Sequence, residues 1–207
     1  MRKKIKIAAY ALALILVGTG AEAAPKTVHR RTTSTLVFGL WVQRSDIAPR
    51  LYTLTNWYVE INKSGGRIDS QLFFERILCE ENTGQAPCVT LEQRTGTSRP
   101  QGRRFRVPAD LKRASLDAVF DLQTILPPGV PVGPPVATRI VASWTAIDAP
   151  ERAHGVTSYD GRCAYRQTVS ETGFRSRAAA TIDGASIGRT TEARIVRSIV
   201  DEERAIC

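Results

Sequence analysis

The sequence predicts an all-β protein, an antiparallel β-sandwich of about nine strands in a single domain. Three observations support this fold class. Apolar and polar residues alternate with a period of two along most of the chain. Turn signals containing glycine or proline separate these segments at short intervals, and helical periodicity is scarce. A proline-dense segment, residues 127–135, divides the strands into two groups, which favours a sandwich over a barrel.

The chain begins with the pattern of an export signal in residues 1–23. Basic residues at the start precede an apolar run at residues 7–17, which is shorter than the roughly 20 residues of a membrane-spanning helix. Ala21 and Ala23 form a small-x-small pattern, so we expect cleavage after Ala23 and no stable membrane insertion afterwards. No cysteine lies near the cut, which argues against a bacterial lipoprotein. The sequence therefore predicts a secreted or periplasmic protein.

The mature chain is predicted to contain a flexible leader, residues 24–34, and one β-sandwich domain, residues 35–207. The segment 51–62 shows the strand pattern most clearly, because it alternates strictly and is rich in β-branched and aromatic residues. The expected strands are residues 36–43, 51–62, 67–79, 89–93, 114–123, 138–147, 163–169, 174–182 and 194–201.

Local turn signals predict two consecutive hairpins near the start of the domain. Gly65 and Gly66 lie between the segments 51–62 and 67–79, and glycine adopts the positive φ of a tight turn without steric cost. A polar loop at residues 80–87 then leads into the next strand. Three neighbouring antiparallel strands are therefore expected from local signals alone.

Irregular segments separate the later strands. Residues 95–104 are interrupted by glycine and proline and are predicted to be a loop, followed by a short edge strand at 105–107. Residues 127–135 are predicted to form a stiff, extended connection, either a crossover between two sheets or a boundary between two halves, because proline this dense cannot lie inside a sheet. Residues 148–161 are predicted to be a long polar loop that contains His154.

The four cysteines all lie in the predicted mature chain, and an even number in an exported protein favours two disulfides. Three pairings are possible. We favour Cys79–Cys88, which closes a short loop, and Cys163–Cys207, which ties the last residue to an internal strand. Loop entropy suggests roughly 3 to 4 kcal/mol of stabilisation for each. Cysteine ligands of zinc are usually two to four residues apart, a spacing that the first pair exceeds, so no metal and no cofactor is predicted.

The chain is basic, with 29 Lys and Arg residues against 20 Asp and Glu residues and a formal net charge of +9. This balance favours contact with anionic surfaces, such as a cell-surface or envelope polymer, although an ordinary solvated surface is the alternative explanation. No RNA- or DNA-binding motif is present, and exported chains rarely meet nucleic acid, so no nucleic-acid partner is predicted.

Arginines beside an aromatic residue are the main candidates for ligand binding. The predicted ligand-binding residues are Arg99, Arg103, Arg104, Phe105 and Arg106. A basic loop next to an aromatic ring can bind phosphate, sulfate or carboxylate groups. Ordinary surface charge, or protection of an edge strand, is the alternative. Arg175 and Arg177 form a second group on one side of a predicted strand.

No residue is predicted to be catalytic. A Ser-His-Asp site would have to use His154, with Ser158, Asp148 or Asp160 near it in sequence. His29 lies in the predicted leader.

Sugar cleavage would need two carboxylates, and Asp117 and Asp121 are the pair to consider because they share one face of a strand. Four residues along a strand span roughly 13 Å, which exceeds the separation in glycosidases. Glu75 is a further acid that could oppose one of them across strands.

Three hypotheses for the function follow. The leading one is a non-enzymatic exported module for binding or interaction. The second is a binder of an anionic glycan, lipid headgroup or envelope polymer that uses the arginines of residues 99–106, and salt should weaken such binding. The third is a secreted hydrolase, which a polar cleft converging on His154 would support. Fold analogy alone does not choose between them.

Overall fold

The computed structural model describes residues 26–81, 88–101, 103–126, 133–161 and 163–206. These residues form an antiparallel sheet, which confirms the predicted all-β class, while the predicted signal peptide, residues 1–23, lies outside the described residues. The strands are β1 (Thr27–Ala48), β2 (Leu51–Ser64), β3 (Arg67–Glu80), β4 (Cys88–Thr97), β5 (Arg104–Arg106), β6 (Arg113–Leu126), β7 (Val136–Ala146), β8 (Glu151–Tyr159), β9 (Tyr165–Ile182), β10 (Ala185–Ser186) and β11 (Arg189–Ala205). Within these ranges, no helix is long and apolar enough to cross a membrane.

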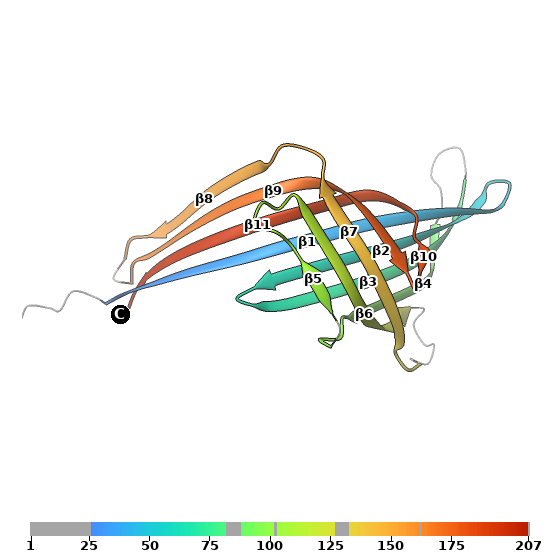
Figure 1. Ribbon diagram of the computed structural model, residues 1–207, viewed down its shortest axis with the longest axis horizontal. Coiled ribbons are helices and arrows are strands. Elements are labelled where there is room, and N and C mark those ends of the chain that lie inside the picture. The colour runs from blue at the N-terminus through green and yellow to red at the C-terminus, as the bar shows by residue number, and fades with distance from the viewer. Residues whose placement is uncertain (1–25, 82–87, 102, 127–132, 162, 207) are drawn as a thin grey trace, which may run out of the picture.

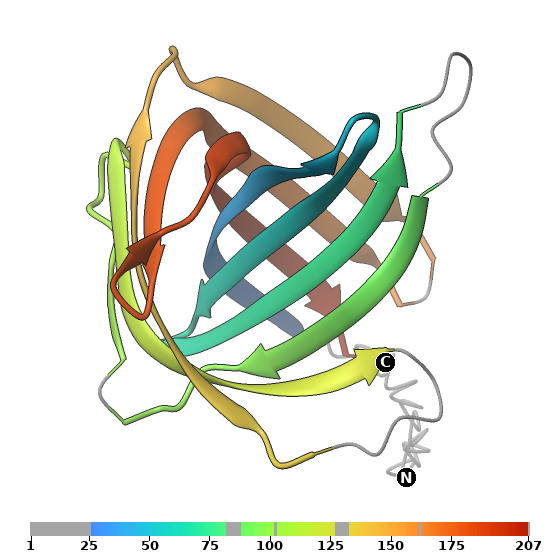
Figure 2. The same cartoon turned by 90° about the vertical axis from the view of Figure 1, so that its right-hand side faces the viewer.

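The sheet closes on itself. Pairing runs in the order β9–β11–β1–β2–β3–β4–β6–β7, and β7 then pairs with β9. Figure 2 shows these strands surrounding a common interior. A sandwich of two separate sheets is therefore not confirmed. The reason is that the strands before residues 127–135 pair with those after them at two places, β1 with β11 and β6 with β7, so both groups belong to one closed sheet.

Strand β1 begins at Thr27, so most of the predicted flexible leader, residues 24–34, is strand instead. Its first residues pair with the end of β11, from Thr27 opposite Ala205 onwards. This segment is polar and exposed, and backbone hydrogen bonds to β11 hold it in place. Because both faces of this segment are polar, it lacks the apolar alternation from which strands were predicted.

The predicted polar loop at residues 148–161 is also largely strand, because it contains β8. The two strands predicted at 163–169 and 174–182 are one continuous strand, β9. Together with the first part of β1 and the last part of β11, these strands form an extension beyond the ring, which we call the arm (Figure 1). The arm consists of residues 27–33, 151–159, 165–173 and 198–205.

The ring is filled by inward-pointing side chains rather than by solvent. Trp41 on β1 and Trp144 on β7 are fully buried, and their rings meet edge to face with centroids 6.0 Å apart. The Trp144 Nε1–H donates a hydrogen bond to the carbonyl oxygen of Phe38 at 2.8 Å. Strands β1 and β7 do not pair, so this contact joins two walls of the ring across its interior.

The segment between β5 and β6 closes one end of this core. Leu111, at a φ of 58°, places its side chain in the core with 3% exposure. The Arg197 guanidinium of β11 donates a hydrogen bond to the carbonyl oxygen of Ala109 at 2.8 Å, and the Ala146 N–H donates to that of Lys112 at 2.9 Å. The segment is thereby anchored to two different strands of the ring.

One of the two predicted disulfides is confirmed. Cys79 and Cys88 are bonded where β3 ends and β4 begins, and they lie directly opposite each other in the strand register. Cys207 lies outside the described residues, so Cys163–Cys207 stays a prediction.

Candidate functional site

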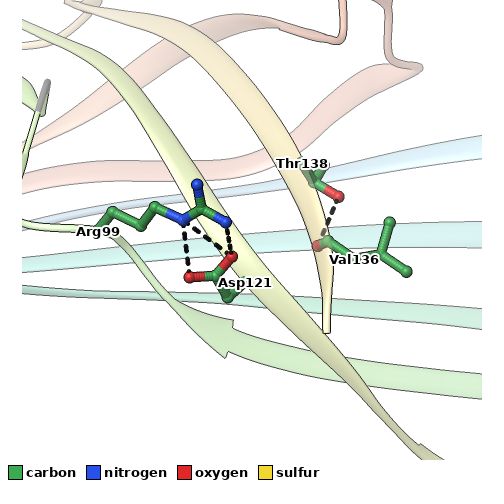
Figure 3. A network of polar contacts seen from close by, with 4 residues as sticks. All are labelled: Arg99, Asp121, Val136 and Thr138. Atoms are coloured by element: carbon green, nitrogen blue, oxygen red, sulfur yellow. Dashed lines mark hydrogen bonds and ion pairs between the residues drawn. The ribbon is translucent and has the colours of Figure 1, made fainter. Parts of the chain in front are cut away.

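The five predicted ligand-binding residues, Arg99, Arg103, Arg104, Phe105 and Arg106, do not lie together at one site. Arg99 is already paired, because its guanidinium binds both carboxylate oxygens of Asp121 on β6 at 2.5 to 3.0 Å (Figure 3). This pairing lowers the pKa of the Asp121 carboxyl, because the hydrogen bonds from Arg99 favour its ionised form. Asp121 therefore neutralises Arg99, and Arg99 is poorly available to an external anion.

Arg103 and Phe105 do not share a binding surface with the other predicted residues. The Arg103 guanidinium donates a hydrogen bond to Ser98 Oγ at 3.1 Å and lines a polar cleft beside the β2–β3 hairpin. In that cleft Ser98 is hydrogen-bonded to Ser70, and both serines are buried. Phe105 is partly buried and packs against the hydrophobic core. Phe105 thus anchors β5 rather than offering its ring to a ligand.

Arg104 and Arg106 are the two predicted binding residues that remain exposed on one surface. They flank Phe105 on β5, so both side chains leave the strand on the side away from the core. They line a depression of about 580 Å³ on the outer face of β5, β6, β7 and β9, which we call the basic trough. Its lining residues are Arg104, Arg106, Ser115, Leu116, Asp117, Val141, Ala142, Ser143, Ala179, Ala180, Thr181 and Ser186.

The floor of the basic trough is made of small side chains because of the strand register. Arg106 lies opposite Ser115, Ser115 opposite Ser143, and Ser143 opposite Ala179. Neighbouring strands are about 4.8 Å apart, so this row runs roughly 14 Å from β5 to β9. A low floor of hydroxyl and methyl groups leaves room for an extended ligand between the longer side chains at its edges.

Further arginines border this floor. Arg113 on β6 and Arg177 on β9 lie in the next row, on either side of Thr145. Both are exposed. Arg139 on β7 holds Asp117 with two hydrogen bonds of 2.9 and 3.0 Å.

Asp117 is the carboxylate of the trough lining. Its pKa is lowered by the hydrogen bonds from Arg139 and, more weakly, by the nearby charge of Arg104. The carboxyl therefore stays ionised and engaged with Arg139. Within the described ranges, Arg104, Arg106, Arg113 and Arg177 have no carboxylate at ion-pair distance.

His154 lies on the exposed strand β8 rather than in a loop. Its Nδ1 is 3.2 Å from the Oγ of Ser170 on β9, a serine that sequence proximity did not suggest. Of the acids considered with it, Asp148 instead binds Arg175. An exposed His–Ser contact on an open strand does not support the hydrolase hypothesis, which requires a polar cleft converging on His154.

The carboxylates considered for sugar cleavage are engaged separately. Asp117 binds Arg139 and Asp121 binds Arg99, and both carboxyl pKa values are lowered. A glycosidase acid needs a raised pKa, so this arrangement opposes that role. Glu75 lies on β3, where it accepts hydrogen bonds from neighbouring polar side chains. In the described part of the chain, no cluster of three or more metal-ligating side chains could hold an ion.

Tyr58 occupies a different part of the outer surface, on β2. Its ring lies 6.1 Å from that of Phe38, and its O–H donates a hydrogen bond to Glu60 Oε2 at 2.7 Å. Burial, followed by this hydrogen bond, raises the pKa of Tyr58 to about 12. The carboxylate accepts from the neutral phenol, so ionisation would both lose the bond and bring two negative charges together.

We expect Tyr58 to ionise near pH 12, above the ordinary tyrosine pKa of 10.0. Since the folded-state pKa is the higher one, the neutral phenol stabilises the fold fully below pH 10, and this contribution is lost as the pH rises toward 12. The measurement is the ultraviolet phenolate titration of the wild type minus that of Tyr58→Phe. A difference spectrum that appears near pH 10 would contradict the prediction.

Sequence reasoning identified Arg104, Arg106 and Arg177 as candidates but missed the small residues between them. Alternation along β6 and β7 already places Ser115 and Ser143 on the outer face. Only the register of β5, β6, β7 and β9 places those residues in one row. A search for outward-facing small residues on arginine-flanked strands could have identified them as candidates.

Compared with known proteins, the sequence matches no protein-family model, and no curated protein is found as a relative.

Proposed function

We propose that this chain is an exported, non-enzymatic binding module that holds an anionic polymer in the basic trough. The polymer is of the kind found at cell surfaces or in envelopes, with sulfate, phosphate or carboxylate groups along an extended chain. The observation that carries the proposal is a set of exposed arginines, without ion-pair partners among the described residues, around a floor of small side chains. The export signal at residues 1–23 and a second disulfide, Cys163–Cys207, are part of the same proposal.

The arrangement of charge supports an anionic ligand. Arg104 and Arg106 are two residues apart on β5, which separates their Cα atoms by about 7 Å. Arg177 lies on β9, at the other side of the floor. Guanidinium groups bind sulfate, phosphate and carboxylate through paired N–H donors, and Asp117 is already engaged by Arg139.

The shape of the trough supports a polymer rather than a compact small molecule. A small-molecule site usually buries most of its ligand in an enclosed apolar cavity. The basic trough is an open depression across a sheet face, with exposed Ser115, Ser143 and Ala179 along its floor. A ligand that lies across several strands can meet arginines at both edges at once.

The disulfide supports an oxidising compartment. Cys79–Cys88 is formed, and such bonds persist in secreted and periplasmic proteins but rarely in the cytosol. An exported protein meets envelope and extracellular polymers, many of which are anionic.

We expect the double substitution Arg104→Glu and Arg106→Glu to weaken binding of dextran sulfate and of polygalacturonate at least about tenfold, through lost attraction and added repulsion. The matched control is Arg30→Glu with Arg166→Glu, which changes the net charge equally on exposed positions of the arm. Affinity is measured by calorimetry at two salt concentrations, with neutral dextran as the blank. Binding should weaken as salt rises.

The control distinguishes a site from overall charge. If the arm variant loses as much affinity as the trough variant, binding reflects net charge and the trough is not the site. If the wild type binds neither polyanion at low salt, the proposed function is wrong. Circular dichroism of each variant verifies that the fold is retained.

A further inference from the structure

Strand β8 presents a long open edge at the margin of the molecule (Figure 1). In the described structure it pairs with β9 alone, and all nine of its residues are exposed. Val156 and Tyr159 on it are 50% and 64% exposed. An open edge offers unpaired N–H and C=O groups to another strand, and proteins usually protect such edges.

Several other edges in the described part of the sheet carry such protection. Strands β5 and β10 are only three and two residues long. The free edge of β1 in the arm carries the successive basic residues His29, Arg30 and Arg31. Strand β8 contains no lysine or proline, its two charged residues, Glu151 and Arg152, stand at its start, and its register with β9 is unbroken from Glu151 to Tyr159. Its open edge is therefore suited to pairing.

We propose that β8 pairs antiparallel with β8 of a second copy of this chain, forming a two-fold symmetric dimer. Arg152 on the strand and Asp160 directly after it favour one register. With Val156 opposite Val156 of the second copy, Arg152 lies opposite Asp160, and the pair occurs twice by symmetry. A register centred on Gly155 would instead place Arg152 opposite Ser158, with no opposite charge to meet.

The arm makes this pairing sterically accessible. Strand β8 lies in the part of the sheet that extends beyond the ring, along its outer margin (Figure 1). It begins beside Gly173, nearest the ring, and ends beside Tyr165. Antiparallel pairing therefore places the ring of each copy beside the far end of the other arm, and the sheet continues from one arm into the next. The dimer does not involve the basic trough and stands independently of the proposed function.

Cysteine cross-linking tests the register directly. In the proposed dimer the two copies of residue 156 face each other across the axis with Cα atoms about 4.5 to 5.5 Å apart, which is within disulfide range. We expect Val156→Cys to form a covalent dimer under mild oxidation. The matched control is Thr168→Cys, because Thr168 lies opposite Val156 on β9, one strand further from the axis. Intact mass before and after reduction measures both.

Charge exchange provides a second test that leaves the cysteines untouched. Arg152→Asp alone and Asp160→Arg alone should each weaken the dimer at least about tenfold, and the two together should restore it. Sedimentation equilibrium gives the dissociation constants. A wild type that stays monomeric at all concentrations overturns the proposal. So does equal cross-linking of the two cysteine variants, or a double variant no tighter than the single ones.

Discussion

Replacing Gly96 with alanine is expected to destabilise the protein by about 3 kcal/mol, because β4 and β6 approach too closely at this point to admit a side chain. A Cβ atom at Gly96 would overlap the carbonyl oxygen of Asp121 and lie 2.7 Å from its carbon. It would also lie 3.1 Å from the Cα of Leu122. All three atoms belong to the backbone of β6, so no side-chain rotation can relieve the clash.

The location of this clash makes the effect large. The register between β4 and β6 covers only Gln93 to Thr95, and one isolated bridge continues it from Ser98 to Phe120. This short pairing is one of the links that keep the ring closed. A backbone shift that makes room for the added methyl group would separate β4 from β6, which are paired over only a few residues.

Gly155→Ala is the matched control, since Gly155 also lies in a strand but a Cβ there meets no atom within 4 Å. Its expected change is within about 0.5 kcal/mol. Urea unfolding of both variants gives the comparison. Equal, small effects at the two glycines would show that β4 and β6 are not in close contact at Gly96.

Replacing Trp144 with alanine is expected to cost about 3 to 5 kcal/mol, the usual range for a buried tryptophan. Trp144 is 1% exposed and packs edge to face against Trp41. Its Nε1–H donates to the carbonyl oxygen of Phe38 at 2.8 Å. The substitution would leave a cavity in the ring and remove one hydrogen bond to a carbonyl oxygen on β1.

Trp144→Phe separates these two contributions. Phenylalanine keeps much of the apolar contact with Trp41 but cannot donate to Phe38, and losing one hydrogen bond costs about 0.5 to 1.5 kcal/mol. Its effect should therefore fall between those of the wild type and Trp144→Ala. Chemical unfolding and near-ultraviolet circular dichroism measure the series. A loss below about 1 kcal/mol for Trp144→Ala would mean that β1 and β7 are not joined through the core.

Strands with a buried face could be predicted from the sequence, and exposed strands could not. The segment 51–62 alternates because one face points into the core, and it corresponds to β2. Residues 148–161 lack this alternation, yet β8 forms there because its backbone pairs with β9. The start of β1 escapes prediction for the same reason. Alternation reports burial of side chains, whereas these strands depend on backbone hydrogen bonds to a distant segment.

The candidate site was likewise predictable from the sequence only in part. An arginine-rich segment around Phe105 is visible in the sequence, but pairing with Asp121 occupies Arg99 and a hydrogen bond to Ser98 draws Arg103 elsewhere. Strand β5 then separates Phe105, which packs inward, from its two arginine neighbours. Sequence proximity suggested one site for all five residues. Side chains alternate along β5, however, so Phe105 lies on the inner face and Arg104 and Arg106 lie on the outer face.

The sequence by itself determined the all-β class, the β2–β3 hairpin at Gly65 and Gly66, and the Cys79–Cys88 bridge, because each depends on residues close together in the chain. The tertiary structure decided that the sheet closes into a ring and that Ser115, Ser143 and Ala179 form one surface. Both outcomes depend on registers between strands far apart in sequence. Those registers arise when the whole interior packs around Trp41 and Trp144, and no local pattern encodes them.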